Sequence, residues 1–184
     1  MIVAIVLSKN FSFSKYAMIL SAALIHEVGH IVAAKILNIK IKRINLDIMG
    51  AIIETDTLFC SYKKEAVLCL AGPLANIISF IVLSIIPLPF DLRLFKISSV
   101  FFAAINLLPA KCFDGGRALS CIFLSKLRPS IAARFIEISS FICVFLLWTV
   151  SVYFIMRTGS YLSLFVFSGS LFAKLFLLPE KFKE

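Results

Sequence analysis

Four long apolar runs dominate the sequence and dictate its fold class. A helix that crosses the hydrocarbon core of a bilayer needs about 20 largely apolar residues. Runs near that length occupy residues 16–37, 66–86, 138–156 and 161–178, and residues 97–108 form a shorter fifth. Hydrophobic residues make up 61% of the chain and charged residues 16%, whereas soluble globular proteins have about 45–50% and about 25%. We therefore predict an all-α polytopic membrane protein with about five transmembrane helices.

The run at 97–108 ends where a helix is hard to continue. It leads into Pro109, and an Asp-Gly-Gly turn follows at residues 114–116. Irregular backbone at membrane depth has to line a cavity or be buried in protein, because lipid cannot satisfy free carbonyls. We expect a broken or re-entrant segment here, followed by an amphipathic interfacial helix at 117–127.

Residues 40–55, between the first two runs, are rich in isoleucine and have Gly50 near their middle. This pattern favours a short β-hairpin at the membrane surface, with a plain polar loop as the alternative. Neither repeats nor a shift in composition marks a second domain. We expect one domain over residues 1–184, with a core at 16–127 and a C-terminal helical pair at 135–178.

The net charge of +9 would suggest a nucleic-acid partner in a soluble protein. Here Lys and Arg flank the apolar runs, so topology and lipid headgroups explain them better, and we expect no nucleic-acid partner. With five spans, thirteen Lys and Arg fall on the side of the hairpin and the C-terminus and five on the other, Lys35 being left uncounted. The positive-inside rule then places the hairpin and the C-terminus in the cytoplasm.

The only two histidines, His26 and His30, lie in the first apolar run on either side of Glu27. Positions i and i+4 of a helix share one face, so both imidazoles can bind one metal. Glu27 lies beside that face and can reach a metal-bound water, as in His-Glu-x-x-His zinc proteases. A charge near the bilayer centre costs at least about 2.5–3.5 kcal/mol, which points to function. The alternative is that the histidines and Glu27 are buried, hydrogen-bond one another and bind no metal.

A catalytic zinc site needs a third protein ligand, and the chain has no third histidine. Asp114 is the best candidate, because a carboxylate at membrane depth needs a cation. Its alternative role is to cap the following helix. Weaker ligand candidates are Cys112, Glu54 and Asp56. The five cysteines contain no Cys-x-x-Cys pair, which disfavours both a thiolate zinc site and a disulfide framework.

Three motifs together resemble the site-2 proteases, a family of intramembrane zinc metalloproteases. They are His-Glu-x-x-His at residues 26–30, Asn-x-x-Pro-x-x-x-x-Asp-Gly at 106–115 and Ala-Gly-Pro-Leu-Ala-Asn at 71–76. The order of the spans is most similar to the branch of stage IV sporulation protein FB, which processes the precursor of a sporulation sigma factor. The resemblance covers about residues 22–127.

The resemblance implies one Zn²⁺ per chain, held by His26, His30 and Asp114. Glu27 would accept a proton from the attacking water and return it to the leaving amine. The implied activity is regulated intramembrane proteolysis in a bacterial-type cell membrane, with the active site open toward the cytoplasm. The implied partners are a membrane-associated protein substrate, the lipid bilayer and membrane regulatory proteins.

Two further residues have expected roles in substrate binding. Asn106 either donates a hydrogen bond to the substrate oxyanion or bonds a neighbouring helix. The resemblance implies that the hairpin around Gly50 takes the substrate as an added strand.

The rival interpretation is a membrane metal transporter or zinc-binding scaffold without hydrolysis. Such a protein would keep His26, His30 and Asp114 but would not need Glu27. A substitution at Glu27 therefore separates the two functions.

Overall fold

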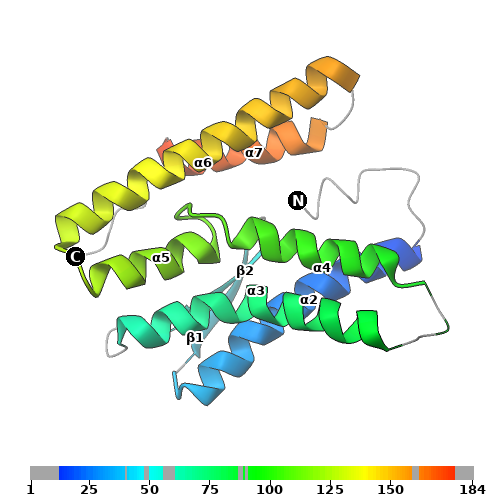
Figure 1. Cartoon of the computed structure of the whole chain (residues 1–184), viewed down its shortest axis with the longest axis horizontal. Coiled ribbons are helices and arrows are strands. Elements are labelled where there is room, and N and C mark those ends of the chain that lie inside the picture. The colour runs from blue at the N-terminus through cyan, green and yellow to red at the C-terminus, as the bar shows by residue number, and fades with distance from the viewer. Residues whose placement is uncertain are drawn as a thin grey trace.

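The computed structural model describes residues 13–39, 61–86, 89, 91–157, 164–173 and 175. It describes the backbone alone of 41–47, 50–55, 158, 162–163, 174 and 176. This part of the chain forms six helices and two strands (Figure 1). In chain order they are α2 (Phe13–Ile36), β1 (Ile41–Asp47), β2 (Gly50–Thr55), α3 (Tyr62–Ile85), α4 (Arg93–Asn106), α5 (Asp114–Leu124), α6 (Pro129–Thr158) and α7 (Leu162–Phe176).

The predicted fold class, an all-α protein with about five transmembrane helices, was wrong. Among the described helices, three are long and apolar enough to cross a membrane, namely α2, α3 and α6. Helices α4, α5 and α7 have 14, 11 and 15 residues, too few at about 1.5 Å per residue to cross a hydrocarbon core of about 30 Å. Hydropathy reports how far an apolar run extends, but not how much of it is one regular helix.

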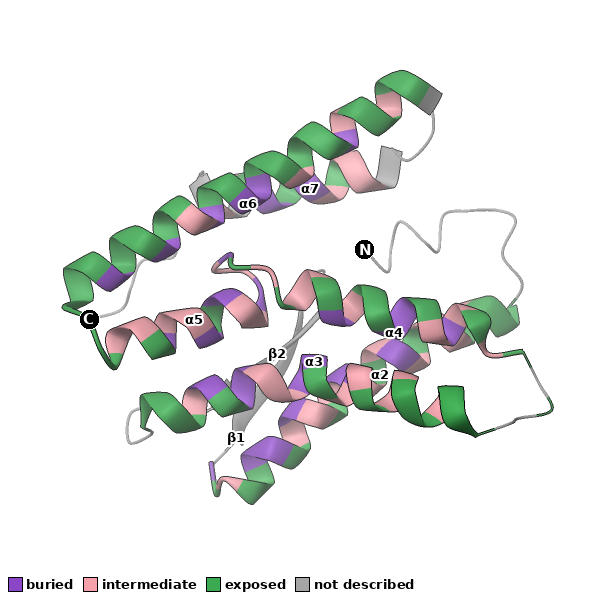
Figure 2. Ribbon diagram, viewed as in Figure 1, coloured by how far each residue is buried: buried purple, intermediate pink, exposed green. Residues whose placement is uncertain are grey.

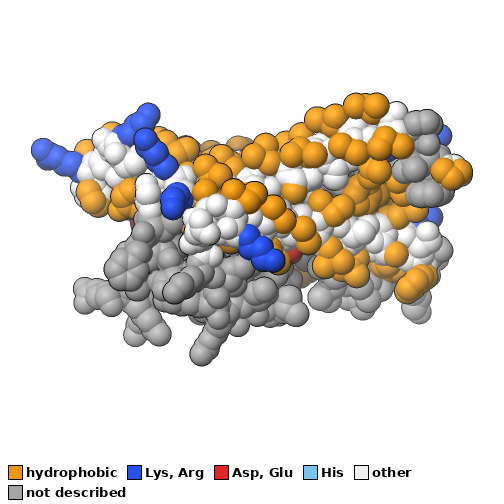
Figure 3. Space-filling view, turned by 90° about the horizontal axis from the view of Figure 1, so that it is seen from below, with side chains coloured by type: hydrophobic (Ala, Val, Ile, Leu, Met, Phe, Trp, Pro, Cys, Tyr) orange, Lys and Arg blue, Asp and Glu red, His pale blue; other side chains and the backbone are white. Residues whose placement is uncertain are grey.

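The helices pack in two connected groups. Helices α2, α3 and α4 contact one another, α5 packs against α3, and α6 contacts both α5 and α7. Buried residues lie mainly between neighbouring helices, while the outward faces are largely exposed (Figure 2). Exposed side chains include large apolar ones such as Leu24, Ile78 and Phe145, which suit contact with lipid. On the face seen in Figure 3, Lys and Arg gather mainly at the end where α5 meets α6.

Small residues bring α2 and α3 into close contact. A Cβ placed on Gly29 would lie 2.7 Å from the carbonyl oxygen of Ala71 and 2.7 Å from the Cβ of Ala75. Glycine and alanine at such positions let helix backbones approach closely inside a membrane. This contact sets the distance between the helix that carries the histidines and its neighbour.

Strands β1 and β2 pair antiparallel within the range where a hairpin was expected. Their register runs from Asp47 opposite Gly50 to Ile41 opposite Thr55, with an irregularity between Ile41 and Arg43. Helix α2 ends before them at Ile36. Two residues later, the φ of 54° at Asn38 lies in the left-handed region that asparagine tolerates at helix ends.

The backbone between α4 and α5 is irregular over residues 107–113. Tight turns satisfy part of it, since the Ala110 N–H donates to the Leu108 carbonyl (2.9 Å) and the Phe113 N–H to the Ala110 carbonyl (2.9 Å). Helix α5 begins at Asp114, three residues before the helix predicted at 117–127. The two glycines explain this early start, because a Cβ on Gly115 or Gly116 would collide with the carbonyl of Leu107 or Ala110.

The irregular segment is anchored on the C-terminal helices. Ala110 and Phe113 are buried in one apolar cluster with Val144 of α6 and Leu171 of α7. The backbone N–H of Lys111 donates to Ser140 Oγ at 2.9 Å. The residue that follows Phe113 is Asp114, so this cluster holds the start of α5 in place.

Candidate metal centre

His26, His30 and Asp114 converge on one point. The Oδ2 of Asp114 lies 3.0 Å from the Nε2 of His26 and 3.2 Å from the Nε2 of His30, and the two Nε2 atoms are 3.2 Å apart. The histidines come from successive turns of α2, and Asp114 is the first residue of α5. The fold thus brings together groups that are 84 and 88 residues apart in the chain.

The centre is largely shielded from solvent. His26 is only 6% exposed, and the Asp114 side chain 14%. Burial alone would raise the pKa of Asp114, but hydrogen bonds and charge from the two imidazoles outweigh burial and hold that pKa well below its ordinary value. The positive end of the α5 dipole adds to the stability of the anion. Asp114 is therefore an anionic donor at neutral pH.

Asp114 does not act as the helix cap that was its alternative role. The N-cap of α5 is Phe113, and no side chain caps this helix by a hydrogen bond. The Oδ2 of Asp114 instead contacts both histidine rings.

Helix α3 contacts both histidine rings at their Nδ1 atoms. The Nδ1–H of His30 donates to the carbonyl of Leu68 at 2.9 Å, and the side-chain amide of Asn76 lies 3.3 Å from the Nδ1 of His26. Between them, a Cβ on Gly72 would collide with the Nε2 of His30 and lie 2.9 Å from the Cε1 of His26. Residues 68, 72 and 76 share one face of α3 because they are four apart. That spacing was a signal for these contacts, which the sequence analysis missed.

Glu27 follows His26 on α2 and is partly buried. Asn106 is the last residue of α4, and its Nδ2 donates to the Phe102 carbonyl of the same helix at 3.0 Å. Gly50 is the first residue of β2. The roles expected for these three residues in proton transfer and substrate binding stay predictions.

Of the weaker ligand candidates, Cys112 has a described side chain and does not join the cluster. In the described part of the chain the group of metal-binding side chains consists of His26, His30 and Asp114. Cys112 packs beside the apolar cluster of α6 and α7. Glu54 belongs to β2, of which only the backbone is described, and Asp56 lies outside the described residues.

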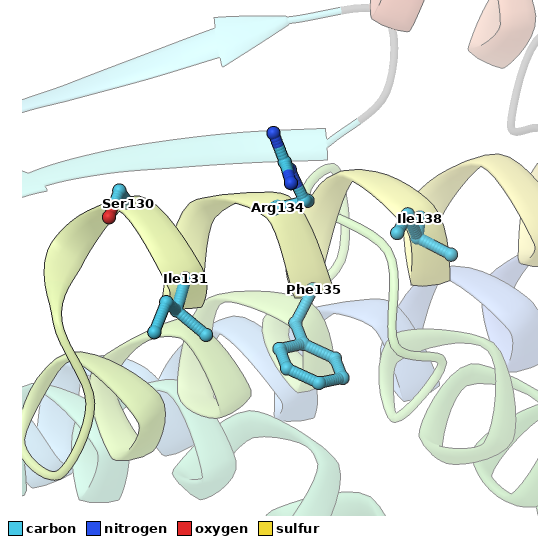
Figure 4. Close-up of a pocket in the computed structure, with 5 residues that line it drawn as sticks. All are labelled: Ser130, Ile131, Arg134, Phe135 and Ile138. Carbon is cyan, nitrogen blue, oxygen red and sulfur yellow. The ribbon is translucent and has the colours of Figure 1, made fainter.

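A separate hollow of about 320 Å³ lies along the first turns of α6. Figure 4 shows its lining, which consists of Ser130, Ile131, Arg134, Phe135 and Ile138. None of these residues belongs to the histidine cluster, so the hollow is distinct from the candidate metal centre.

The donor set fits zinc in both chemistry and spacing. Two imidazoles and one carboxylate make one of the catalytic zinc sets, which leave a fourth position open. A tetrahedral zinc with ligand bonds of about 2.0–2.1 Å separates its ligand atoms by about 3.3 Å. The three donor atoms here are 3.0, 3.2 and 3.2 Å apart. Small ring adjustments would therefore suffice to hold the ion.

The chain is similar to known proteins in sequence and in fold. No protein-family model matches the chain. A zinc metalloprotease of Methanocaldococcus jannaschii is 29% identical over 119 residues, which cover 60% of this chain and 34% of that protein. The chain thus matches about a third of that relative's length. The solved structure of a site-2 protease from the same organism superposes with a TM-score of 0.61 at 23% identity, covering 93% of this chain and 81% of the other. The chain is therefore a membrane protein that is related to a zinc metalloprotease and has the fold of a site-2 protease.

Proposed function

We propose that this chain is a site-2-type zinc metalloprotease that hydrolyses a peptide bond in or near the membrane segment of a membrane-associated protein. The observation that carries the proposal is the convergence of His26, His30 and Asp114 from α2 and α5 on one point. The related zinc metalloprotease and the shared site-2 protease fold support it.

In this mechanism His26, His30 and Asp114 would hold one zinc ion. Zinc in such a site is a Lewis acid that lowers the pKa of a bound water toward about 7 and polarises a carbonyl. The Glu27 carboxylate accepts the proton of the attacking water and delivers it to the nitrogen of the leaving amine. Gly72 contributes by leaving the space beside both imidazoles free.

The substrate has to be extended locally before attack, because a helix hides its peptide bonds in its own hydrogen bonds. We propose that it pairs with the β1–β2 hairpin as an added strand. We also propose that the site opens toward the cytoplasm on the side of the hairpin. Five basic residues lie in and beside the hairpin, a composition that favours the cytoplasmic side; they are Lys40, Lys42, Arg43, Lys63 and Lys64. The assignment to the sporulation branch stays a prediction.

A Glu27→Gln substitution tests the proposal against the metal transporter or scaffold. The chain is co-expressed with epitope-tagged, membrane-anchored transcription-factor precursors, and product release and bound zinc are both measured. We expect Glu27→Gln to lower cleavage by at least about 100-fold and to leave zinc content unchanged. Glu137→Gln, which alters an exposed carboxylate on α6, is the matched control and should cleave normally. Zinc binding without a Glu27-dependent product would favour the transporter or scaffold.

A further inference from the structure

We propose that Asn76 is a positioning residue that holds the His26 ring in the tautomer able to bind the metal. The inference rests on the proposed zinc site and assigns a role on α3. Asn76 is completely buried, and its amide lies 3.3 Å from the Nδ1 of His26. It is thus placed on the side of the ring opposite the metal centre.

The two ligand rings need the same tautomer. A neutral imidazole carries one N–H, so an Nε2 that offers its lone pair to a metal requires a proton on Nδ1. His30 meets this requirement through the Leu68 carbonyl, which can only accept a hydrogen bond. The Nδ1 of His26 faces Asn76 instead, and the Asn76 side chain has both a donor and an acceptor.

The orientation of the Asn76 amide decides the tautomer of His26. With Nδ2 toward the ring, Asn76 donates to Nδ1, and the Nε2 of His26 has to carry the proton. In that orientation Asn76 Oδ1 is buried and has no partner among the described residues. The oxygen and nitrogen of an amide have nearly the same shape, so the hydrogen-bond network decides which faces the ring.

Asn76 makes one hydrogen bond to His26 in either orientation of its amide. Whether His26 binds a metal therefore determines which orientation the amide adopts. When His26 binds a metal through Nε2, Oδ1 of Asn76 accepts from Nδ1–H. Helix α3 then supplies an acceptor to each ligand ring, Leu68 to His30 and Asn76 to His26. Such outer partners fix ring orientation, and their loss costs about 10–100-fold in metal affinity.

Two near-isosteric variants separate acceptor, donor and packing roles. Asn76→Asp keeps an acceptor and loses the donor, whereas Asn76→Leu loses both. Ser99→Ala is the matched control, because Ser99 is also fully buried and has an Oγ without a described partner. Purified full-length protein in detergent is titrated with Zn²⁺ against a chelator, and the visible absorption of the Co²⁺-loaded protein reports ligand geometry.

We expect Asn76→Asp to bind zinc at least as tightly as the wild type with an unchanged cobalt spectrum. Asn76→Leu should bind about 10–100-fold more weakly, and Ser99→Ala should match the wild type. Weakened binding in Asn76→Asp would overturn the acceptor role, and this outcome is informative even when Asn76→Leu does not fold. Wild-type zinc affinity in a folded Asn76→Leu would also overturn it. A wild-type protein that binds no zinc would instead refute the proposed function, and this inference with it.

Discussion

The α-carbon of Gly72 faces the imidazole of His30 so closely that a methyl group does not fit between them. Gly72 lies in the middle of a membrane-spanning helix, where its cost in helix propensity is about 1 kcal/mol relative to alanine. Glycine at position 72 therefore leaves room for the metal centre, although it lowers the stability of helix α3.

Gly72→Ala should weaken zinc binding by at least about tenfold, because the new methyl group displaces both rings from outer partners of the kind whose loss costs 10–100-fold. Chelator competition on purified protein measures the effect. Gly169→Ala in α7 is the control, since a Cβ there meets nothing within 4 Å. Equal zinc affinity in the two variants would contradict the geometry of the site.

Removing the metal should lower the stability of the folded protein, and this effect should require Asp114 as a metal ligand. A ligand at 100 times its Kd stabilises a fold by about 2.7 kcal/mol, which corresponds to a Tm change of about 5–10 °C in a chain of this size. We expect a strong chelator to lower the Tm of the wild type and of Asp91→Asn, whose carboxyl is 69% exposed. Asp114→Asn should respond little, and a full response from this variant would exclude Asp114 as a ligand.

In anchoring the 107–113 segment, Ser140 should contribute more to the free energy of unfolding than the ion pair between Lys111 and Glu137. Ser140→Ala leaves the backbone N–H of Lys111 without its acceptor, which costs about 1–3 kcal/mol when the group is buried. The Glu137 side chain that pairs with the Lys111 Nζ is 65% exposed, so Glu137→Gln should cost less than about 1 kcal/mol. Thermal unfolding of both variants measures the order, and the reverse order would show that the ion pair is the stronger anchor.

Substrate pairing with β2 can be tested by single proline substitutions. In an antiparallel pair, backbone N–H groups point alternately toward the partner strand and away from it, so only one of Gly50→Pro and Ala51→Pro removes an outward N–H. That variant should lose cleavage and keep zinc, while the other should disturb the β1–β2 pairing itself. Cleavage that survives the loss of the outward N–H would argue against strand addition to β2.

Much of the candidate site could be predicted because its chemistry is local or unusual in a membrane. The four-residue spacing of His26 and His30 places them on one helix face whatever the rest of the chain does. A carboxylate in an apolar segment needs a cation, so Asp114 could be predicted as the third metal ligand. Both arguments use residue type and spacing alone.

Other features depend on how helices meet, which spacing alone does not determine. The contact between Asn76 and His26 requires the register set by Gly29 against α3. The start of α5 at Asp114 depends on the carbonyls of Leu107 and Ala110, which leave room only for glycine. The number of spans was overestimated because hydropathy does not show where an apolar helix ends.

Asp114, the third metal donor, directly follows the 107–113 segment, which packs against α6 and α7. Phe113, directly before Asp114, is buried against Val144 and Leu171, so loosening that helical pair would withdraw the aspartate from the histidines. An unbiased genetic search for zinc-deficient mutants should therefore recover changes in α6 and α7, in side chains that supply no donor atom.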